Sequence, residues 1–203
     1  MLAGPAGVSA VKGFEIVALA ASAGGLRALT DVLAALAPNF PAALVVVQHL
    51  DPRHRSLMAE ILGKRTRVGV REAREGDALQ TGLAFVAPPN RHLLVNPDGT
   101  LSLSQSELVH FVRPSADLLF ESVAASFRER AIAVVLSGSG SDGAMGVKAI
   151  KKMGGTVIVQ DQNTAEFAGM PGAAQQTGAV DFILPLEEIA PALEKLVRVE
   201  DAA

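Results

Sequence analysis

The chain of 203 residues contains no cysteine, no tryptophan and no tyrosine. The absence of cysteine excludes disulfide bonds, thiol nucleophiles and zinc–thiolate sites. Aromatic residues make up only 4% of the chain, and no run of aromatic and basic residues suits stacking on single-stranded nucleic acid. A net charge of −3 likewise gives no general attraction to nucleic acid. We therefore expect no nucleic-acid partner.

Long apolar runs are also lacking, because none approaches the roughly 18 residues that a membrane-spanning helix needs. The first 13 residues include Gly4, Pro5 and Gly7 and lack the basic start of a secretory signal. We therefore expect residues 1–13 to form a disordered N-terminal tail. A cytoplasmic protein without membrane insertion is expected.

Hydrophobic residues are plentiful, at 49% of the chain, and are enough to bury the core of one domain. Short apolar runs alternate with stretches of helical periodicity, which indicates βαβ units and a mainly parallel sheet covered on both faces. We predict strands at 16–21, 44–48, 68–71, 83–87, 132–136, 156–159 and 182–184, and helices at 26–36, 56–64, 116–128, 145–153 and 187–197.

A hairpin interrupts this alternation. Residues 93–95 and 101–103 flank Asn-Pro-Asp-Gly at 96–99, which is strong turn chemistry and predicts an antiparallel pair. The predicted fold is therefore α/β, a three-layer, doubly wound, mainly parallel sheet with an antiparallel hairpin. We expect one domain over residues 14–203.

The first predicted strand ends in a turn with unusual composition. Ser22 follows the apolar run and is surrounded by Ala21, Ala23, Gly24 and Gly25. Small residues let the backbone approach a bound group closely, and the N–H groups at a helix start point toward developing negative charge. A serine hydroxyl at this turn could be a nucleophile, or it could simply cap the helix that follows.

Two further residues follow predicted parallel strands in the same way. His49 ends the second strand, and Asp142 lies in the loop after 132–136. Because the carboxyl ends of parallel strands meet at one edge of a sheet, we expect Ser22, His49 and Asp142 to converge there. A hydroxyl nucleophile needs a base, an imidazole can accept its proton, and a carboxylate can orient the imidazole. The three residues thus predict a serine hydrolase that needs no cofactor and no metal.

Several motifs occur in an order that is similar to a known family. They are Ala-Ser-Ala-Gly-Gly at 21–25, Val-Gln-His at 47–49, Ala-Pro-Pro-Asn-Arg-His at 87–92, Arg-Pro-Ser-Ala-Asp at 113–117, Gly-Ser-Gly-Ser-Asp-Gly-Ala at 138–144 and Gly-Met-Pro at 169–171. Together they resemble the catalytic domain of chemotaxis protein-glutamate methylesterases of the CheB type.

The resemblance implies an activity and a set of partners. It implies hydrolysis of glutamate γ-methyl esters on the cytoplasmic helices of methylated chemoreceptors, with deamidation of receptor glutamines as a second activity. It also implies that Ser22, His49 and Asp142 are the catalytic triad. Such enzymes usually carry an N-terminal receiver domain, and here only a short stretch precedes the first strand. The sequence thus leaves open a lack of phospho-control, a fragment of a longer protein, or control by a separate regulator or receiver protein.

Four other residues are candidate substrate contacts. The resemblance implies an oxyanion hole formed by the backbone N–H groups of Ala23 and Ser139, where Ser139 replaces the methionine often found in the family. Arg113 is expected to contact an acidic substrate segment, although its motif also suits a plain helix start with the proline near the first helical position. Met170, in a segment predicted to be a loop, is expected to form a wall of the ester pocket.

Two alternatives belong to other functional classes. Residues 138–143 match G-x-G-x-x-G, with Asp161 about 20 residues further on, as in dinucleotide-binding oxidoreductases. Asp142 argues against this reading because its carboxylate would lie where a pyrophosphate must bind. The other alternative is a receptor-binding or scaffold module that has lost catalysis.

Overall fold

A computed structural model describes residues 14–49 and 56–198, so the predicted tail over 1–13 lies outside the described residues. Within the described part, seven strands form one sheet in the order β3-β4-β2-β1-β7-β8-β9, and every neighbouring pair is parallel. These strands are β1 (Ile16–Ala21), β2 (Ala43–Gln48), β3 (Gly69–Glu72), β4 (Leu83–Val86), β7 (Ala131–Val135), β8 (Thr156–Gln160) and β9 (Phe182–Leu184).

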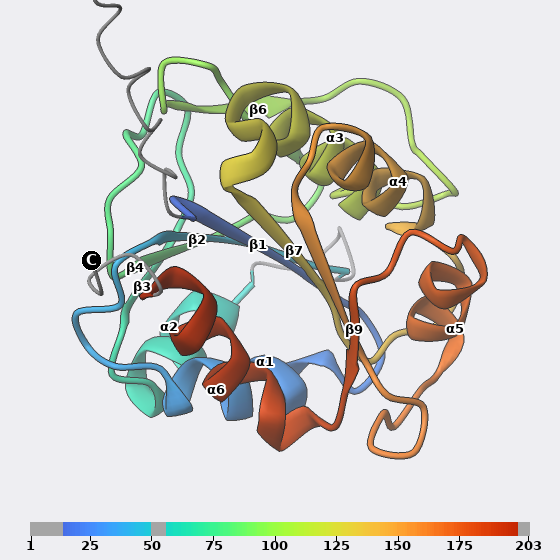
Figure 1. Ribbon diagram of the computed structural model, residues 1–203. Coiled ribbons are helices and arrows are strands. Elements are labelled where there is room, and N and C mark those ends of the chain that lie inside the picture. Colours follow the sequence, from blue (N-terminus) through green and yellow to red (C-terminus); the bar gives the residue numbers. More distant parts are fainter. Residues whose placement is uncertain (1–13, 50–55, 199–203) are drawn as a thin grey trace, which may run out of the picture.

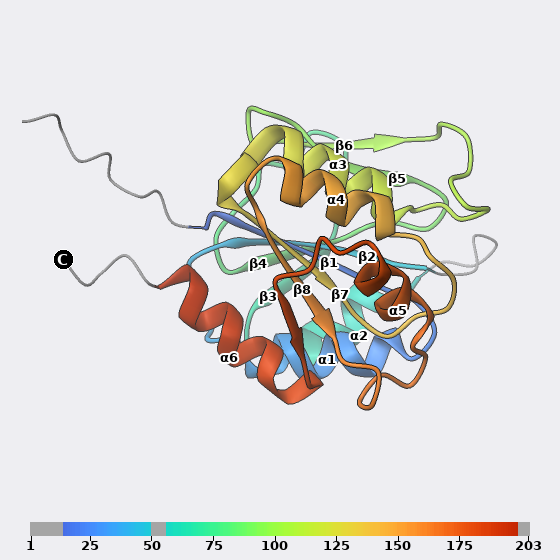
Figure 2. The same ribbon diagram turned by 45° about the vertical axis from the view of Figure 1, so that its right-hand side comes forward.

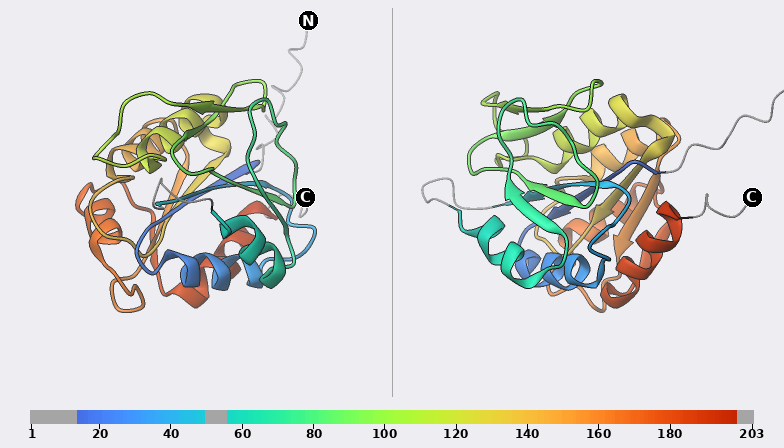
Figure 3. Two further views of the ribbon diagram at one scale, coloured as in Figure 1. Left: turned by 180° about the vertical axis from the view of Figure 1, so that it is seen from behind. Right: turned by 90° about the vertical axis from the view of Figure 1, so that its left-hand side faces the viewer.

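Helices cover both faces of this sheet and give three layers (Figures 1 and 2). One face carries α1 (Gly25–Ala35), α2 (Met58–Arg65) and α6 (Leu186–Val197), and the other carries α3 (Ala116–Phe127) and α4 (Ala144–Lys152). A short 3-10 turn, Arg128–Arg130, follows α3, and α5 (Gly169–Gln176) lies beside α4. The antiparallel hairpin of β5 (His92–Val95) and β6 (Leu101–Ser104) packs on the outside of α3, as the views in Figure 3 also show.

The central strands read as continuous apolar runs because both of their faces are buried. All six residues of β1 are fully buried. Alternate residues such as Ala18 and Ala20 face the core under α3 and α4, whereas Val17 and Leu19 face the core under α1, α2 and α6. A parallel sheet covered on two sides demands this composition.

Strand β1 lies where the chain changes direction across the sheet. After β1 the chain builds β2, β3 and β4 on one side, and then returns to add β7, β8 and β9 on the other. In open α/β sheets, ligands bind in the crevice outside the carboxyl ends of the strands at such a reversal. The loops that follow β1, β2 and β7 therefore border the crevice in which a ligand is expected to bind.

The predicted fold class is confirmed, and the predicted strands and helices are present with ends shifted by one or two residues. Helix α5 was not predicted, because its sequence Gly-Met-Pro-Gly at the start has poor helix propensity. Pro171 lies in the first turn, where a missing N–H is tolerated. Met170, which was predicted to lie in a loop, is therefore in the first turn of a helix.

Candidate active site

The turn after β1 holds Ser22 without using it as a helix cap. Gly24 is the N-cap residue of α1 and has a left-handed φ of 73°. A Cβ atom on Gly24 would lie 2.7 Å from the Ser137 hydroxyl oxygen, so a larger residue does not fit. The N–H of Gly25 donates to the carbonyl of Ser22 at 2.9 Å and closes the turn. The helix-capping interpretation of Ser22 is therefore wrong.

Ser22 and His49 are the next residues after a register pair. Ala21 and Gln48 are partners in the parallel β1–β2 ladder, and the N–H of His49 donates to the carbonyl of Ala21 at 3.1 Å. Since side chains alternate along strands, both residues continue the face of Ala20 toward α3. In the described part of the chain, the Ser22 hydroxyl makes no hydrogen bond with the imidazole. Contacts of this kind commonly tighten only when substrate binds.

The imidazole of His49 is anchored on a buried carboxylate. Its Nε2 lies 2.8 Å from Oδ2 of Asp142, a residue that is 3% exposed. Burial raises the pKa of Asp142, but the hydrogen bonds from His49 and from the backbone of Ala116 and Asp117 outweigh it, so the pKa is lowered below its ordinary value. An ionised Asp142 requires the proton on Nε2, which leaves Nδ1 free to accept a proton. In the chymotrypsin arrangement the two ring nitrogens have the opposite assignment.

The N-terminus of α3 holds Asp142 in place. The hydroxyl of Ser115 donates to Asp142 at 2.8 Å, and the N–H groups of Ala116 and Asp117 donate at 2.6 and 3.1 Å. A helix N-terminus offers unpaired N–H groups and a favourable dipole for an anion. Ser115 is the N-cap of α3, and Pro114 lies two residues before the first helical residue, Ala116, so this motif does begin a helix, with the proline just outside it.

A second buried histidine supports this arrangement from behind. His92 is fully buried, its Nδ1 accepts from the N–H of Ser115 at 3.1 Å, and its Nε2 donates to the carbonyl of Glu107 at 3.0 Å. Burial lowers the pKa of His92 and favours the neutral ring. No role at the site was predicted for Ser115 or His92. Both belong to the quoted motifs, but only the folded chain brings them to Asp142.

The loop after β7 is tied to the Ser22 turn. The N–H of Ser22 donates to the carbonyl of Ser137 at 3.0 Å, and the Ser137 hydroxyl donates to the carbonyl of Ala23 at 2.8 Å. In the part of the chain that the structure describes, neither the N–H of Ala23 nor that of Ser139 has a hydrogen-bond acceptor. Ser139 is exposed. Two unpaired amides therefore flank the turn, as an oxyanion hole requires.

Met170 and Arg113 lie close to these residues but are already engaged. Met170 is 1% exposed, and a Cβ atom on Gly138 would lie 2.3 Å from its sulfur and 2.9 Å from Cβ of Ser22. The Arg113 guanidinium donates to Oδ1 of Asn90 and to two loop carbonyls, at 2.6 to 3.0 Å. Direct contact of either side chain with substrate stays a prediction.

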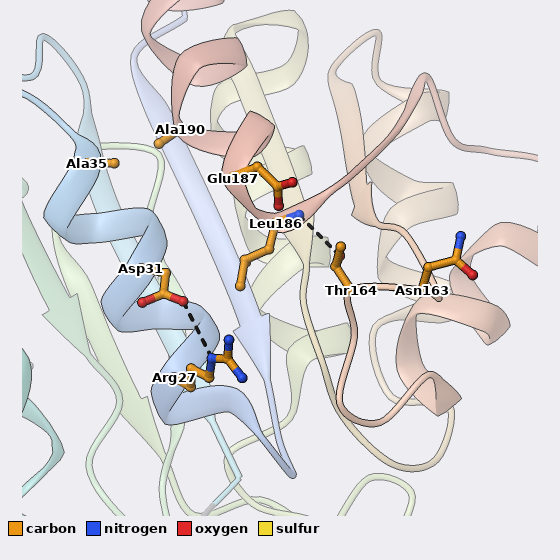
Figure 4. Close-up of a pocket in the computed structure, with 8 residues that line it drawn as sticks. All are labelled: Arg27, Asp31, Ala35, Asn163, Thr164, Leu186, Glu187 and Ala190. Atoms are coloured by element: carbon orange, nitrogen blue, oxygen red, sulfur yellow. Dashed lines mark hydrogen bonds and ion pairs between the residues drawn. The ribbon is translucent and has the colours of Figure 1, made fainter.

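A groove leads away from Ser22 along α1. A cavity of about 550 Å³ is lined by Ser22, Gln48 and Arg65 among others, and a second of about 550 Å³ shares Arg27 and Asp31 with it. Figure 4 shows the second cavity between α1 and the start of α6. The Arg27–Asp31 ion pair in it is 3.7 Å long and largely exposed. A separate cavity of about 140 Å³ is lined by His49 and Arg113 among others.

All residues of the site lie within the region that a family model matches. The model described as CheB methylesterase matches residues 17–193. The chain belongs to the CheB methylesterase family. The predicted resemblance is thereby confirmed. Among the residues that the structure describes, no helix has the length and apolar character to cross a membrane.

Individual relatives of this chain have names that fit the CheB family. A protein-glutamate methylesterase/protein-glutamine glutaminase of Moorella thermoacetica is 42% identical over 189 residues, covering 91% of this chain and 45% of that protein. Another with these two activities in its name, from Burkholderia orbicola, is 46% identical, and 88% of this chain and 52% of that protein are covered. The chain thus spans about half the length of these two relatives. In contrast, its match to a 42% identical protein of Leptospira interrogans covers 92% of that protein.

A solved CheB structure has the same fold. The crystal structure of the Thermotoga maritima CheB methylesterase catalytic domain superposes with a TM-score of 0.87 at 35% identity, covering 92% of this chain and all of that chain. No support emerges for a dinucleotide-binding oxidoreductase. The structure gives a physical reason. The glycine-rich segment contains Asp142, whose carboxylate is hydrogen-bonded to the N-terminus of α3 and would repel a pyrophosphate.

Proposed function

We propose that this protein of the CheB family hydrolyses glutamate γ-methyl esters on chemoreceptors and also deamidates receptor glutamines. The names of the relatives from Moorella thermoacetica and Burkholderia orbicola support both activities. The observation that carries the proposal is the 2.8 Å contact between His49 and the buried carboxylate of Asp142, at the strand end beside Ser22. That pair supplies the base that a serine hydroxyl needs.

The reaction begins with attack of the Ser22 hydroxyl oxygen on the γ-carbonyl carbon of the ester. The Ser22 proton passes to Nδ1 of His49, and ionised Asp142 stabilises the resulting imidazolium through Nε2. The C–O bond to the methoxy group then breaks, His49 returns the proton, and methanol leaves. Water attacks the acyl-enzyme in the same way, which releases the glutamate and restores the Ser22 hydroxyl.

Negative charge develops on the carbonyl oxygen in both steps. We propose that the N–H groups of Ala23 and Ser139 stabilise it, because both lack an acceptor within the described residues and both lie on loops next to Ser22. Typical oxyanion-hole donors each contribute about 100-fold to 1000-fold in rate.

We propose that the substrate segment is a receptor helix that lies in the groove along α1. Arg27 and Arg65 line the cavity at Ser22 and suit the glutamates of such a segment. The exposed Arg27–Asp31 pair contributes little stability and can rearrange when a partner binds. A separate regulator or receiver protein and a cytoplasmic location remain part of the proposal.

Methanol release from methylated receptor tests the function directly. The Ser22→Ala variant should lose turnover by about 10⁴-fold or more while keeping the melting temperature of the wild type. Ser141→Ala is the matched control, since Ser141 is an exposed serine of the loop after β7. Equal methanol release by wild type and Ser22→Ala would refute the nucleophile. A wild-type protein that binds receptor but releases no methanol would instead indicate a scaffold module.

A further inference from the structure

Gln48, the last residue of β2, links the two loops that carry the proposed nucleophile and base. Its side chain is buried, with 5% of the residue exposed. The Nε2 group donates to the carbonyl of Ser22 at 2.7 Å and to the carbonyl of His49 at 3.1 Å. One side-chain amide thus uses both of its N–H groups on the backbones of these two residues.

The orientation of this amide is forced by the same contacts. Turning it over would place Oε1 against two carbonyl oxygens. As it stands, Oε1 is buried and has no hydrogen-bond partner within the described residues. Buried acceptors without partners are rare because they lose their hydration without compensation. The observed orientation therefore keeps both bonds donated by Nε2 and leaves Oε1 without a partner among the described residues.

Gly25 is shaped to this side chain. A Cβ atom at Gly25 would lie 2.1 Å from Oε1 of Gln48 and 2.7 Å from Cβ of Ala21. Any larger residue at Gly25 would push the amide off the two carbonyls. The paired glycines of the turn thus have separate tasks, since Gly24 provides the left-handed backbone and Gly25 makes room for Gln48.

We infer that Gln48 is a positioning residue that holds the Ser22 turn and the His49 backbone at a set separation. This inference rests on the proposed function, because it matters only if Ser22 and His49 act together. The β1–β2 ladder ends at Ala21 and Gln48, and the N–H of His49 makes one further backbone bond to the carbonyl of Ala21. Among the described residues, no backbone bond joins the Ser22 turn itself to His49, and Gln48 supplies that link. Displacement of reacting groups by about 1 Å can lower a rate by about 100-fold.

The principal test replaces Gln48 by methionine, which has a similar shape and no donor. In Gln48→Met, kcat on methylated receptor should fall by about 100-fold, while KM changes less than about threefold. The rate at which a fluorophosphonate modifies Ser22 should fall by a similar factor, because it needs the same alignment. A kcat within threefold of wild type would overturn the inference, whatever the melting temperature.

Thr66→Val is the matched control for the loss of a bridging donor. The Thr66 hydroxyl lies 2.9 Å from the carbonyl of Leu62 and 3.2 Å from that of Val68, just before β3 and so at the opposite edge of the sheet. Its removal should lower the melting temperature and leave both rates within about twofold of wild type. Equal rate losses in Thr66→Val and Gln48→Met would also overturn the inference, since general destabilisation would then explain both.

A second variant covers the case in which Gln48→Met does not fold. In Gln48→Glu, a protonated carboxyl keeps one donor, whereas an ionised carboxyl has none and repels both carbonyl oxygens. The ratio of variant to wild-type modification rate should therefore fall between about pH 5.5 and 8.5, and a constant ratio would contradict the inference. Fluorophosphonate modification requires no receptor. Normal modification of a wild type that releases no methanol would therefore refute the proposed substrate and not the role of Gln48.

Discussion

Asp142 and Asp117 cap each other's helices crosswise. Asp142, just before α4, accepts from the first N–H groups of α3, and Asp117, in the first turn of α3, accepts from the N–H of Gly146 in α4 at 2.7 Å. The two carboxylates respond in opposite ways. Burial, and then the charge of Asp142, raise the pKa of Asp117, whereas hydrogen bonds lower that of Asp142. The surroundings therefore favour the ionised form of Asp142, the carboxylate of the proposed triad, and disfavour the ionised form of Asp117.

The two carboxylates should affect stability with opposite signs. A lowered pKa means that the stabilising contribution of Asp142 is complete above the ordinary value of 3.8 and is lost as pH falls below it. A raised pKa means that ionising Asp117 reduces stability as pH rises through its pKa. At neutral pH, Asp142→Asn should therefore lower the free energy of unfolding by about 2 kcal/mol, and Asp117→Asn should raise it.

Urea unfolding of both variants at several values of pH checks this pair. The advantage of Asp117→Asn over wild type should shrink as the solution becomes acidic, because the wild-type carboxyl then becomes neutral as well. Equal destabilisation by the two substitutions at neutral pH would contradict the assigned roles.

His92 should make the protein sensitive to mild acid. Because burial lowers its pKa below 6.5, its contribution is complete above that value and is lost as pH falls from there toward the folded-state pKa. In His92→Asn, which retains an acceptor near the N–H of Ser115, the free energy of unfolding should vary less with pH in this window. Parallel pH dependence in wild type and variant, measured by urea unfolding, would argue against a buried neutral His92.

The oxyanion proposal separates a backbone effect from a side-chain effect at one position. Ser139→Ala keeps the N–H and should retain most of the methanol release. Ser139→Pro removes the N–H and should lower kcat by about 100-fold to 1000-fold. Melting temperatures show whether both variants fold. Comparable activity of the two variants would exclude the Ser139 N–H as an oxyanion donor.

Blocking the distal part of the groove should weaken receptor binding more than chemistry. Ala35 is exposed and lines the cavity between α1 and α6. In Ala35→Trp, kcat/KM on methylated receptor should fall about tenfold relative to kcat/KM on a small methyl ester. Ala125→Trp, at an exposed alanine near the end of α3 on the other face of the sheet, is the control. An unchanged ratio in Ala35→Trp would remove α1 from the receptor site.

Much of the fold and of the proposed triad could be predicted because the evidence for them is local. Strand β1 is recognisable from six consecutive apolar residues, and the positions of Ser22, His49 and Asp142 after parallel strands follow from where such strands end. Helix α5 was not predicted because the glycines and proline at its start have low helix propensity. The helix is stabilised instead by burial of Met170 and Ala174 in the core.

The sequence by itself determined the residue types that can do the chemistry and the edge of the sheet on which they lie. Only the tertiary structure decided how they are held. The anchoring of Asp142 by Ser115 and the α3 amides, the support of Ser115 by His92 and the bridging of two carbonyls by Gln48 join residues from separate elements. Hydrogen bonds depend on differences of a few tenths of an ångström in the donor–acceptor distance, and sequence spacing carries no such information across the sheet.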